Sequence, residues 1–529
     1  MPSARHTRFA LLAIVAVGLA YATPVADLGW NEGSHYALVE SLDRGTARID
    51  NYRWQTGDLA WVHGHFYSTK APGLALAALP AYATLEAAGA TAVISDRTAT
   101  AWKAARVTIW ALHLWAVVLP AVVMLLLVRS VAERLEPGLG TVTALTLGLA
   151  TLVLPFATVF FSHVLSACLG FAAFVLLWRG RNVDSRLAIP FAAGLLAGLA
   201  ITVEYSLAIV GIALVLYGSV GQPRAIRRAL AYAAGTAIGV IPLLLYNGLA
   251  FGSVWHVSYA NAVSRPGRSG HAELGANSTG FFGVGLPSPR VAAELLFASR
   301  GVITLAPVLG MSLVGLILLY RRGLKAETIT IAFIAVGFLV FNAGYFLPFG
   351  GWVPGPRLLV PALPFVVVPL AAAYRRYPGC TLALAVASAV MLITATATLP
   401  LLPTDDTSRW ASLAAHGGFQ ETVASFGGVA HGWLVGLPFL LPIVAALVFG
   451  ALATPHLQIQ RRDAWAALSL LLAWVLVAST LPRVGHAPGS GVIVLIVCAA
   501  GAGALVVAAA AFAMPRLRSV DTTAPVGQA

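Results

Sequence analysis

Charged residues are scarce in this sequence, and their scarcity excludes a whole class of proteins. Only 10% of the 529 residues are Asp, Glu, Lys or Arg, whereas 59% are hydrophobic and the mean hydropathy is +0.84. Soluble domains carry about 25% charged residues. A globular cytosolic enzyme is therefore excluded.

Cysteine and nucleotide-binding patterns are scarce as well. The three cysteines, Cys168, Cys380 and Cys498, all lie inside apolar runs, which favours neither a disulfide framework nor a zinc site. The sequence has no Gly-rich loop between a strand and a helix, so it does not indicate a nucleotide-sugar donor.

Apolar runs recur from one end of the chain to the other. Each is long enough to cross a hydrocarbon core of about 30 Å as a helix. They predict an all-α integral membrane protein with about 12 to 14 transmembrane helices of roughly 20 residues each. The candidate spans begin near Phe9, Val107, Thr141, His163, Leu187, Tyr205, Ala229, Val302, Thr328, Leu358, Cys380, Trp433, Ala464 and Val492. The two short spans that meet at Glu204 fit a re-entrant pair equally well.

Basic clusters occupy every second connection between these runs. They are Arg129 and Arg134, then Arg179, Arg181 and Arg186, then Arg224, Arg227 and Arg228, then Arg321, Arg322 and Lys325, then Arg375 and Arg376, then Arg461 and Arg462, and finally Arg516 and Arg518. The positive-inside rule places such connections, and here both termini, in the cytoplasm. The net charge of +13 is thus a topology signal. We expect a multi-pass protein of the plasma (inner) membrane.

The remaining connections lie on the outer face. The longest, residues 27–106, holds eight of the twenty acidic residues. Within it, the apolar segment 71–88 has charged flanks, which favours a juxtamembrane helix along the membrane surface over a span.

Acidic side chains just outside the first span are candidates for catalysis. Asp27 and Glu32 lie five residues apart, and either carboxylate can act as a general base on a hydroxyl. A structural role is the alternative, with Asn31 capping a helix and Glu32 in its first turn. Both roles are compatible.

Basic residues on the outer face work against the topology and call for another explanation. Lys70 and Arg357 are candidates for binding a phosphate through charge and hydrogen bonds, with Arg300 and His65 as further outer candidates. Pairing with loop acids or lipid headgroups is the alternative, and exposed pairs contribute little. His163, at an outer span end, is either a site residue or an interface anchor. Glu204 is either a functional intramembrane carboxylate or a wet turn residue.

Several of these segments, in this order, resemble the GT-C superfamily of membrane glycosyltransferases, in the branch of the protein O-mannosyltransferases and bacterial lipid A aminoarabinose transferases. Asn31-Glu32 with Tyr36 is similar to the family's acidic pair and tyrosine-containing helix after the first span, and Lys70-Ala71-Pro72 is similar to its Lys-Pro segment. Gly355-Pro356-Arg357-Leu358-Leu359 and the segment from Phe282 to Pro307 resemble further family segments. The match extends to about Pro364.

The resemblance implies a GT-C-like bundle with a long first outer loop carrying juxtamembrane helices. It implies residues 1–365 as the catalytic transmembrane module, 366–515 as a variable C-terminal transmembrane module and 516–529 as a cytoplasmic tail. The implied activity is transfer of a hexosyl or pentosyl group from a polyprenyl-phosphate donor to a hydroxyl of a glycan, lipid or protein on the outer face. Lys70 and Arg357 hold the donor phosphate, without a cofactor, although a divalent metal is compatible with the loop acids.

One departure from the family pattern bears on the catalytic group. The family has Asp-Glu where this chain has Asn31-Glu32. Either Glu32 acts alone, or Asp27 takes the role, or the chain is an inactive GT-C-like binding protein. A transporter or flippase of a lipid-linked or small anionic substrate has the same composition and topology, and lipid-linked polysaccharide polymerases and ligases are a further class.

Overall fold

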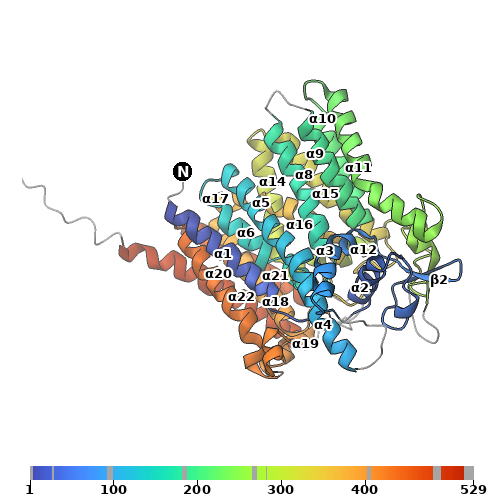
Figure 1. The fold of residues 1–529 in the computed structure, drawn as a ribbon. Helices are drawn as coiled ribbons and strands as arrows, with labels where there is room; N and C mark the ends of the chain where they lie inside the picture. Colours follow the sequence, from blue (N-terminus) through green and yellow to red (C-terminus); the bar gives the residue numbers. More distant parts are fainter. Residues whose placement is uncertain are drawn as a thin grey trace, which may run out of the picture.

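The chain folds into a bundle of helices with one small sheet at its side (Figure 1). The computed structural model describes residues 4–26, 29–91, 99–181, 187–264, 271–281, 283–401, 407–429, 431–480 and 490–517. Within these ranges almost all regular structure is helical, which confirms the all-α membrane class.

Eight helices in the described ranges are long and apolar enough to cross a membrane. They are the stretch Ala105–Leu135, formed by α4 (Ala99–His113), the π-helical turn η2 (Leu114–Val118) and α5 (Leu119–Leu135), together with α8 (His163–Gly180), α11 (Ala225–Phe251), α15 (Lys325–Gly344), α18 (Pro378–Thr398), α20 (Trp433–Ala453), α21 (Arg461–Thr480) and α22 (Ser490–Leu517). Their apolar side chains cover the outside of the bundle as well as its core, as expected of helices that face lipid.

Two bent pairs of helices bring the number in the described ranges to ten if each pair forms one span. The first bends by 99° at Ala306 and Pro307, and the second by 51° near Pro369. Proline lacks the N–H that would continue a helical hydrogen-bond ladder, so a bend follows. The segments are α12 (Pro289–Phe297), α13 (Val302–Leu305), η5 (Pro307–Leu309) and α14 (Gly310–Arg321) in the first, and η6 (Arg357–Ala362), α16 (Leu363–Val367) and α17 (Leu370–Arg376) in the second.

The sequence-based range of 12 to 14 spans also counted helices that are shorter or less apolar than this test requires. These are α1 (Ala4–Ala22), α6 (Gly140–Leu149), α9 (Ala188–Val203) and the pair η3 (Tyr205–Leu207) and α10 (Ala208–Ser219). All form helices where apolar runs predicted them. The segment predicted as juxtamembrane is α3 (Gly73–Ala87), a short apolar helix.

Close packing of α9 against α11 fixes the end of α9 that carries Glu204. Gly194 and Gly198 on α9 face Gly235 and Gly239 on α11: a Cβ on Gly194 would lie 2.0 Å from the Tyr232 carbonyl oxygen. Paired small-xxx-small motifs of this kind let membrane helices approach backbone to backbone.

The loop of residues 27–106, which the sequence predicts to be the first outer loop, carries the sheet and a buried helix. Helix α2 (Trp30–Asp43) is followed by η1 (Asp50–Tyr52), β1 (Leu59–Val62) and β2 (His65–Ser68). His63 and Gly64 join β1 to β2 with φ values of 49° and 83°, the left-handed geometry of a tight hairpin turn. β1 also pairs with β3 (Ala262–Val263), giving the order β2-β1-β3. The sheet therefore joins the first outer loop to the second.

The remaining short elements lie in the same connections or next to the spans. They are α7 (Val153–Phe156), η4 (Ser258–Asn261), α19 (Ser408–Ala415) and η7 (Val423–Gly427). α20, in the predicted C-terminal module, packs along α1; the boundary at residue 365 stays a prediction.

Basic connections meet at one end of the bundle. Arg322 and Arg375 both pair with the buried Glu136, and Arg179 donates to Ser130 Oγ at 2.8 Å. Alternation of basic loops predicts this clustering, because every second connection must lie on the same side. In Figure 1, α2 and β2 lie on the side of the bundle away from the N-terminal end of α1.

Candidate functional site

Helix α2 presents Glu32 and His35 from its first turns into the protein interior. Glu32 is 1% exposed, and neither of its carboxyl oxygens has a hydrogen-bond partner among the described residues. Gly29 makes room for it, since a Cβ there would lie 2.7 Å from Glu32 Oε2. The next turn of the same face carries His35, whose two ring nitrogens are also buried without partners in the described part of the chain.

Burial changes the acid–base properties of both groups. It raises the pKa of Glu32 to about 8, against the lowering effects of the backbone at the helix start and of the Arg357 guanidinium. It lowers the pKa of His35 to about 3, and the nearby Lys70 charge acts in the same direction. At neutral pH, Glu32 is therefore largely protonated and His35 is neutral.

Arg357 lies beside Glu32 at the first residue of η6. It is 8% exposed, its guanidinium carbon lies 5.6 Å from the centre of the Phe161 ring, and its Nε has no hydrogen-bond partner among the described residues. Its side chain crosses Gly350, whose φ is +84°; a Cβ there would lie 2.4 Å from Nε. A buried cation that lacks hydrogen-bond partners is costly unless a ligand supplies them.

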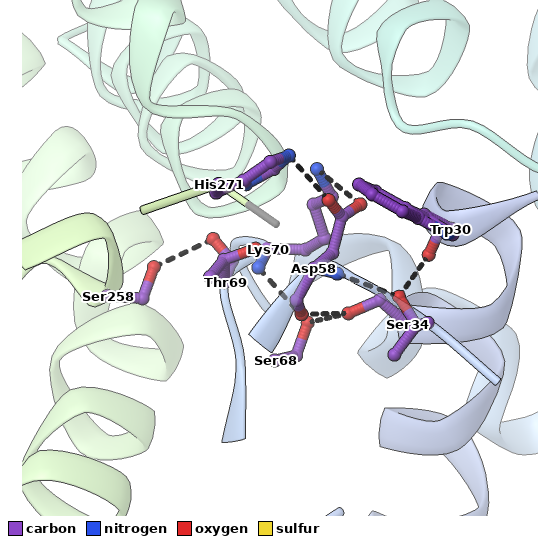
Figure 2. Close-up of polar contacts among 9 residues, drawn as sticks. Trp30, Ser34, Asp58, Ser68, Thr69, Lys70, Ser258 and His271 are labelled. Atoms are coloured by element: carbon purple, nitrogen blue, oxygen red, sulfur yellow. Dashed lines mark hydrogen bonds and ion pairs between the residues drawn. The ribbon is translucent and has the colours of Figure 1, made fainter. Parts of the chain in front are cut away.

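Lys70 is paired with a carboxylate that the sequence did not single out. Its Nζ lies 2.8 Å from Asp58 Oδ2, and the other oxygen, Oδ1, lies 2.6 Å from His271 Nε2 (Figure 2). All three side chains are buried. Burial by itself raises the pKa of Asp58, but His271 and Lys70 outweigh it and hold this pKa well below its usual range.

The hairpin β1–β2 places Asp58 and Lys70 opposite each other, because they flank its open end. The Thr69 N–H donates to the Asp58 carbonyl at 3.2 Å, and the Ser34 hydroxyl on α2 donates to the same carbonyl at 3.0 Å. From the second outer loop, Ser258 Oγ donates to the Thr69 carbonyl at 2.7 Å. Figure 2 shows these contacts converging from α2, the hairpin and the second loop.

A hydrogen-bonded histidine and carboxylate lie at the ends of two further helices. His163, the first residue of α8, places Nδ1 2.8 Å from Oε2 of Glu204, at the end of α9. Both residues are buried. His163 lies near Arg357, because the two side chains contact the same ring: the imidazole centre is 5.9 Å from the centre of Phe161, and the Arg357 guanidinium carbon is 5.6 Å from it.

The structure thus gathers four predicted residues: Glu32, Lys70, Arg357 and His163. The sequence did not find Asp58, His271 or His35 as site residues, because a lone acid or histidine in an outer loop carries no pattern. It noted Glu204 as a possible functional carboxylate, and the structure gives it a histidine partner.

Of the three other predicted residues, two lie elsewhere and one lies outside the described ranges. His65 Nδ1 pairs with Asp50 at 2.9 Å on the hairpin, and both side chains are about one-third exposed (35% and 34%). Arg300 donates to the carbonyls of Gly351 and Val353 at 3.1 and 2.9 Å, so it holds the loop that precedes Arg357. Asp27 lies outside the described residues.

The ranges that the structure describes contain no group of three or more His, Cys, Asp or Glu side chains arranged to hold a metal ion. In the same ranges, the unpartnered polar atoms of the site include those of a carboxyl group, a guanidinium and imidazoles. These groups can together bind a ligand that carries both an anionic group and hydroxyls.

Comparisons with known proteins give distant structural neighbours. No protein-family profile and no curated protein sequence matches the chain. The solved structure of ArnT from Cupriavidus metallidurans bound to undecaprenyl phosphate aligns with 96% of this chain and 78% of its own, at 13% identity and a TM-score of 0.46. The apo oligosaccharyltransferase from Archaeoglobus fulgidus aligns with 88% of this chain, at 14% identity and a TM-score of 0.44.

The present chain spans 58% of that oligosaccharyltransferase. The mannosyltransferase-like branch of the resemblance stays a prediction. TM-scores below 0.5 do not carry residue roles from one protein to another. What the chain does is therefore argued from its own site.

Proposed function

We propose that the protein is a membrane glycosyltransferase that moves a sugar from a polyprenyl-phosphate donor to an acceptor hydroxyl. One observation carries the proposal: both carboxyl oxygens of Glu32 and the Nε of Arg357 are buried and lack hydrogen-bond partners among the described residues. Such groups are tolerated in a low-dielectric interior where a ligand completes them.

Arg357 and Lys70 are the phosphate-binding groups in this proposal. Arg357 offers a guanidinium whose Nε has no hydrogen-bond partner in the described part of the chain, and Lys70 uses one of its three donors on Asp58. Asp58 and His271 hold the ammonium in place. Charge that builds on the departing phosphate is stabilised more strongly here than in water, because the donors are fixed and buried.

Glu32 is the proposed catalytic base. The acceptor oxygen forms a bond to the anomeric carbon, the bond from that carbon to the phosphate oxygen breaks, and the acceptor proton passes to the Glu32 carboxylate. Its raised pKa of about 8 makes the ionised form a strong base, although it is the minor form at neutral pH. Arg357, whose charge lowers this pKa, keeps part of the population ionised.

The proposed topology completes the assignment. We place the termini in the cytoplasm and the site on the outer face of the membrane, where a glycan, lipid or protein supplies the acceptor hydroxyl. Apolar helices that surround the site suit a donor whose tail stays in the bilayer. The ArnT structure named above holds undecaprenyl phosphate, a ligand of the proposed chemical class.

The experiment is donor turnover by the purified protein in lipid, with a panel of radiolabelled polyprenyl-phosphate hexoses and pentoses. We expect one donor to lose its sugar, and the Glu32→Gln variant to bind that donor without consuming it. Asn51→Ala, an exposed change in the same outer loop, is the matched control. If every donor is bound or ignored without turnover, the transferase function is wrong, and transport or a binding role takes its place.

A further inference from the structure

The pair formed by His163 and Glu204 has no role in the proton transfer and phosphate binding described above. Both side chains are buried at the helix ends that face the site. Glu204 sits on extended backbone, at φ −157° and ψ 120°, between α9 and η3. This break in the helix points its carboxylate at α8.

Glu204 fixes the proton of the imidazole. Oε2 lies 2.8 Å from His163 Nδ1, Oε1 accepts a hydrogen bond from Ser206 Oγ at 3.0 Å, and Ser166 Oγ lies 3.0 Å from Oε2. A carboxylate surrounded by donors accepts from Nδ1–H. In the neutral ring, the lone pair is then on Nε2.

Nε2 itself is buried and has no hydrogen-bond partner in the described residues. Two aromatic rings lie beside the imidazole. The Phe156 ring is 5.6 Å away between ring centres and nearly perpendicular to it, at 89°, and the Phe161 ring is 5.9 Å away and tilted by 64°. The Arg357 guanidinium carbon lies over the same Phe161 ring, 5.6 Å from its centre. The free acceptor atom and the proposed phosphate-binding cation therefore flank the same ring.

We propose that His163 Nε2 accepts a hydrogen bond from a hydroxyl of the transferred sugar, and that Glu204 is the positioning residue that fixes the tautomer. This inference rests on the proposed function and names the part of the site that recognises the sugar. A phosphate ester offers only acceptor oxygens at neutral pH, so it cannot satisfy a lone pair; a sugar hydroxyl can. Phe156 and Phe161 add apolar surface for the C–H face of a sugar ring.

The test separates sugar binding from phosphate binding with two probes, undecaprenyl phosphate and the same lipid carrying the hexose or pentose that the wild-type protein consumes. In His163→Phe, we expect the affinity for the sugar-loaded lipid to fall about 5- to 100-fold, the cost of one unsatisfied buried hydrogen bond. The affinity for undecaprenyl phosphate stays the same. Arg357→Ala, in contrast, lowers the affinity for both lipids.

Two milder variants keep the test decisive if His163→Phe does not fold. Gln at position 163 can place an oxygen near the Nε2 position, so His163→Gln retains part of the preference for the sugar-loaded lipid. Glu204→Gln puts a neutral amide beside Nδ1 that can face it with either its oxygen or its N–H, so the tautomer is no longer fixed and that preference falls. Nitrogen-15 NMR of the labelled histidine reads this tautomer change directly. His65→Phe, on the hairpin away from the site, is the matched control.

The outcomes separate the inference from the proposed function. If wild-type protein binds neither lipid, the proposed function fails. Suppose that the wild type consumes a donor, but that His163→Phe and Glu204→Gln lower the affinity for both lipids equally or for neither. The sugar contact is then wrong, and the transferase function stands. An effect on the KM of the acceptor alone would also overturn the inference.

Discussion

Lys70 Nζ lies 2.8 Å from Asp58 Oδ2, and both side chains are almost completely buried. The lysine is thus not a loose cation at the membrane surface but one half of an ion pair, with His271 on the other carboxylate oxygen. The pair holds the hairpin of the first outer loop against the second loop. A donor phosphate that reaches Lys70 would find it already oriented.

The first prediction concerns this pair. We expect Lys70→Met and Asp58→Asn each to lower the free energy of unfolding by about 3–5 kcal/mol, because each leaves a buried partner uncompensated. The double variant should regain part of this loss yet bind polyprenyl phosphate poorly. Denaturant unfolding in detergent measures the stability. Arg290→Ala, in an exposed pair with Glu294, is the control and should change it by less than about 1 kcal/mol. Additive losses in the double variant would show that Lys70 and Asp58 do not depend on each other.

Arg357 should determine phosphate affinity. Replacing it by Ala removes charge-assisted hydrogen bonds worth about 1.5–3 kcal/mol, or roughly 10- to 150-fold in the affinity for undecaprenyl phosphate. Arg357→Lys keeps the charge but not the fork of donors and should recover only part of the loss. Equilibrium binding in nanodiscs measures this affinity. Unchanged affinity in Arg357→Ala would remove this residue from the donor site.

Glu32 should make stability depend on pH. Its pKa is raised from an ordinary 4.5 to about 8 in the folded protein, so the folded state holds this proton more tightly than the unfolded chain. The contribution is complete below about pH 4.5 and is lost as the pH rises through about 8. We expect the Tm of the wild type to fall between pH 6 and pH 9, and that of Glu32→Gln to fall less. Equal falls would mean that Glu32 is not the group that titrates.

Ionisation of Glu32 should also determine how the rate of transfer depends on pH. A base must be ionised, so the rate of transfer at limiting substrate should increase with pH toward about 8 and then level off. A profile that declines over this range would assign Glu32 the role of an acid instead. The comparison requires a donor that the wild type consumes.

Glycine contacts between α9 and α11 should be intolerant of side chains. At Gly235, a Cβ would lie 2.0 Å from the Phe191 carbonyl oxygen, a backbone atom that cannot move aside cheaply. Gly235→Val should therefore separate the two helices and lower the yield of folded protein, whereas Gly501→Ala on α22, with open space around it, should not. Size-exclusion profiles in detergent measure both. A normal profile for Gly235→Val would show that this contact is not required for folding.

The last prediction concerns which side of the membrane each loop faces. Arg321 and Asn51 are both exposed, the first at the basic end and the second in the first outer loop. In a Cys498→Ser background, Asn51→Cys should react with a membrane-impermeant maleimide in intact cells, and Arg321→Cys only after permeabilisation. The reverse pattern would invert the topology and place the site in the cytoplasm.

The sequence by itself determined the class of protein, the helices and half of the site. Hydropathy is a local property, so each apolar run gave a helix whatever its neighbours were. The alternation of Arg clusters likewise predicted that the basic connections lie at one end of the bundle, where Arg322 and Arg375 both pair with Glu136. Span number was harder, because α6, α9 and α10 are apolar but short, and packing rather than hydropathy decides their depth.

Tertiary structure alone decided which polar residues meet. Nothing near Asp58 in the sequence marks it as the partner of His271 in another outer loop. Charge and position in an outer loop do not separate Arg300, which holds a loop, from Arg357, whose charge acts on Glu32; only the family resemblance did. The reason is physical: pairing of buried charges depends on which loops a packed bundle brings together, and that information is spread over all the helices that pack.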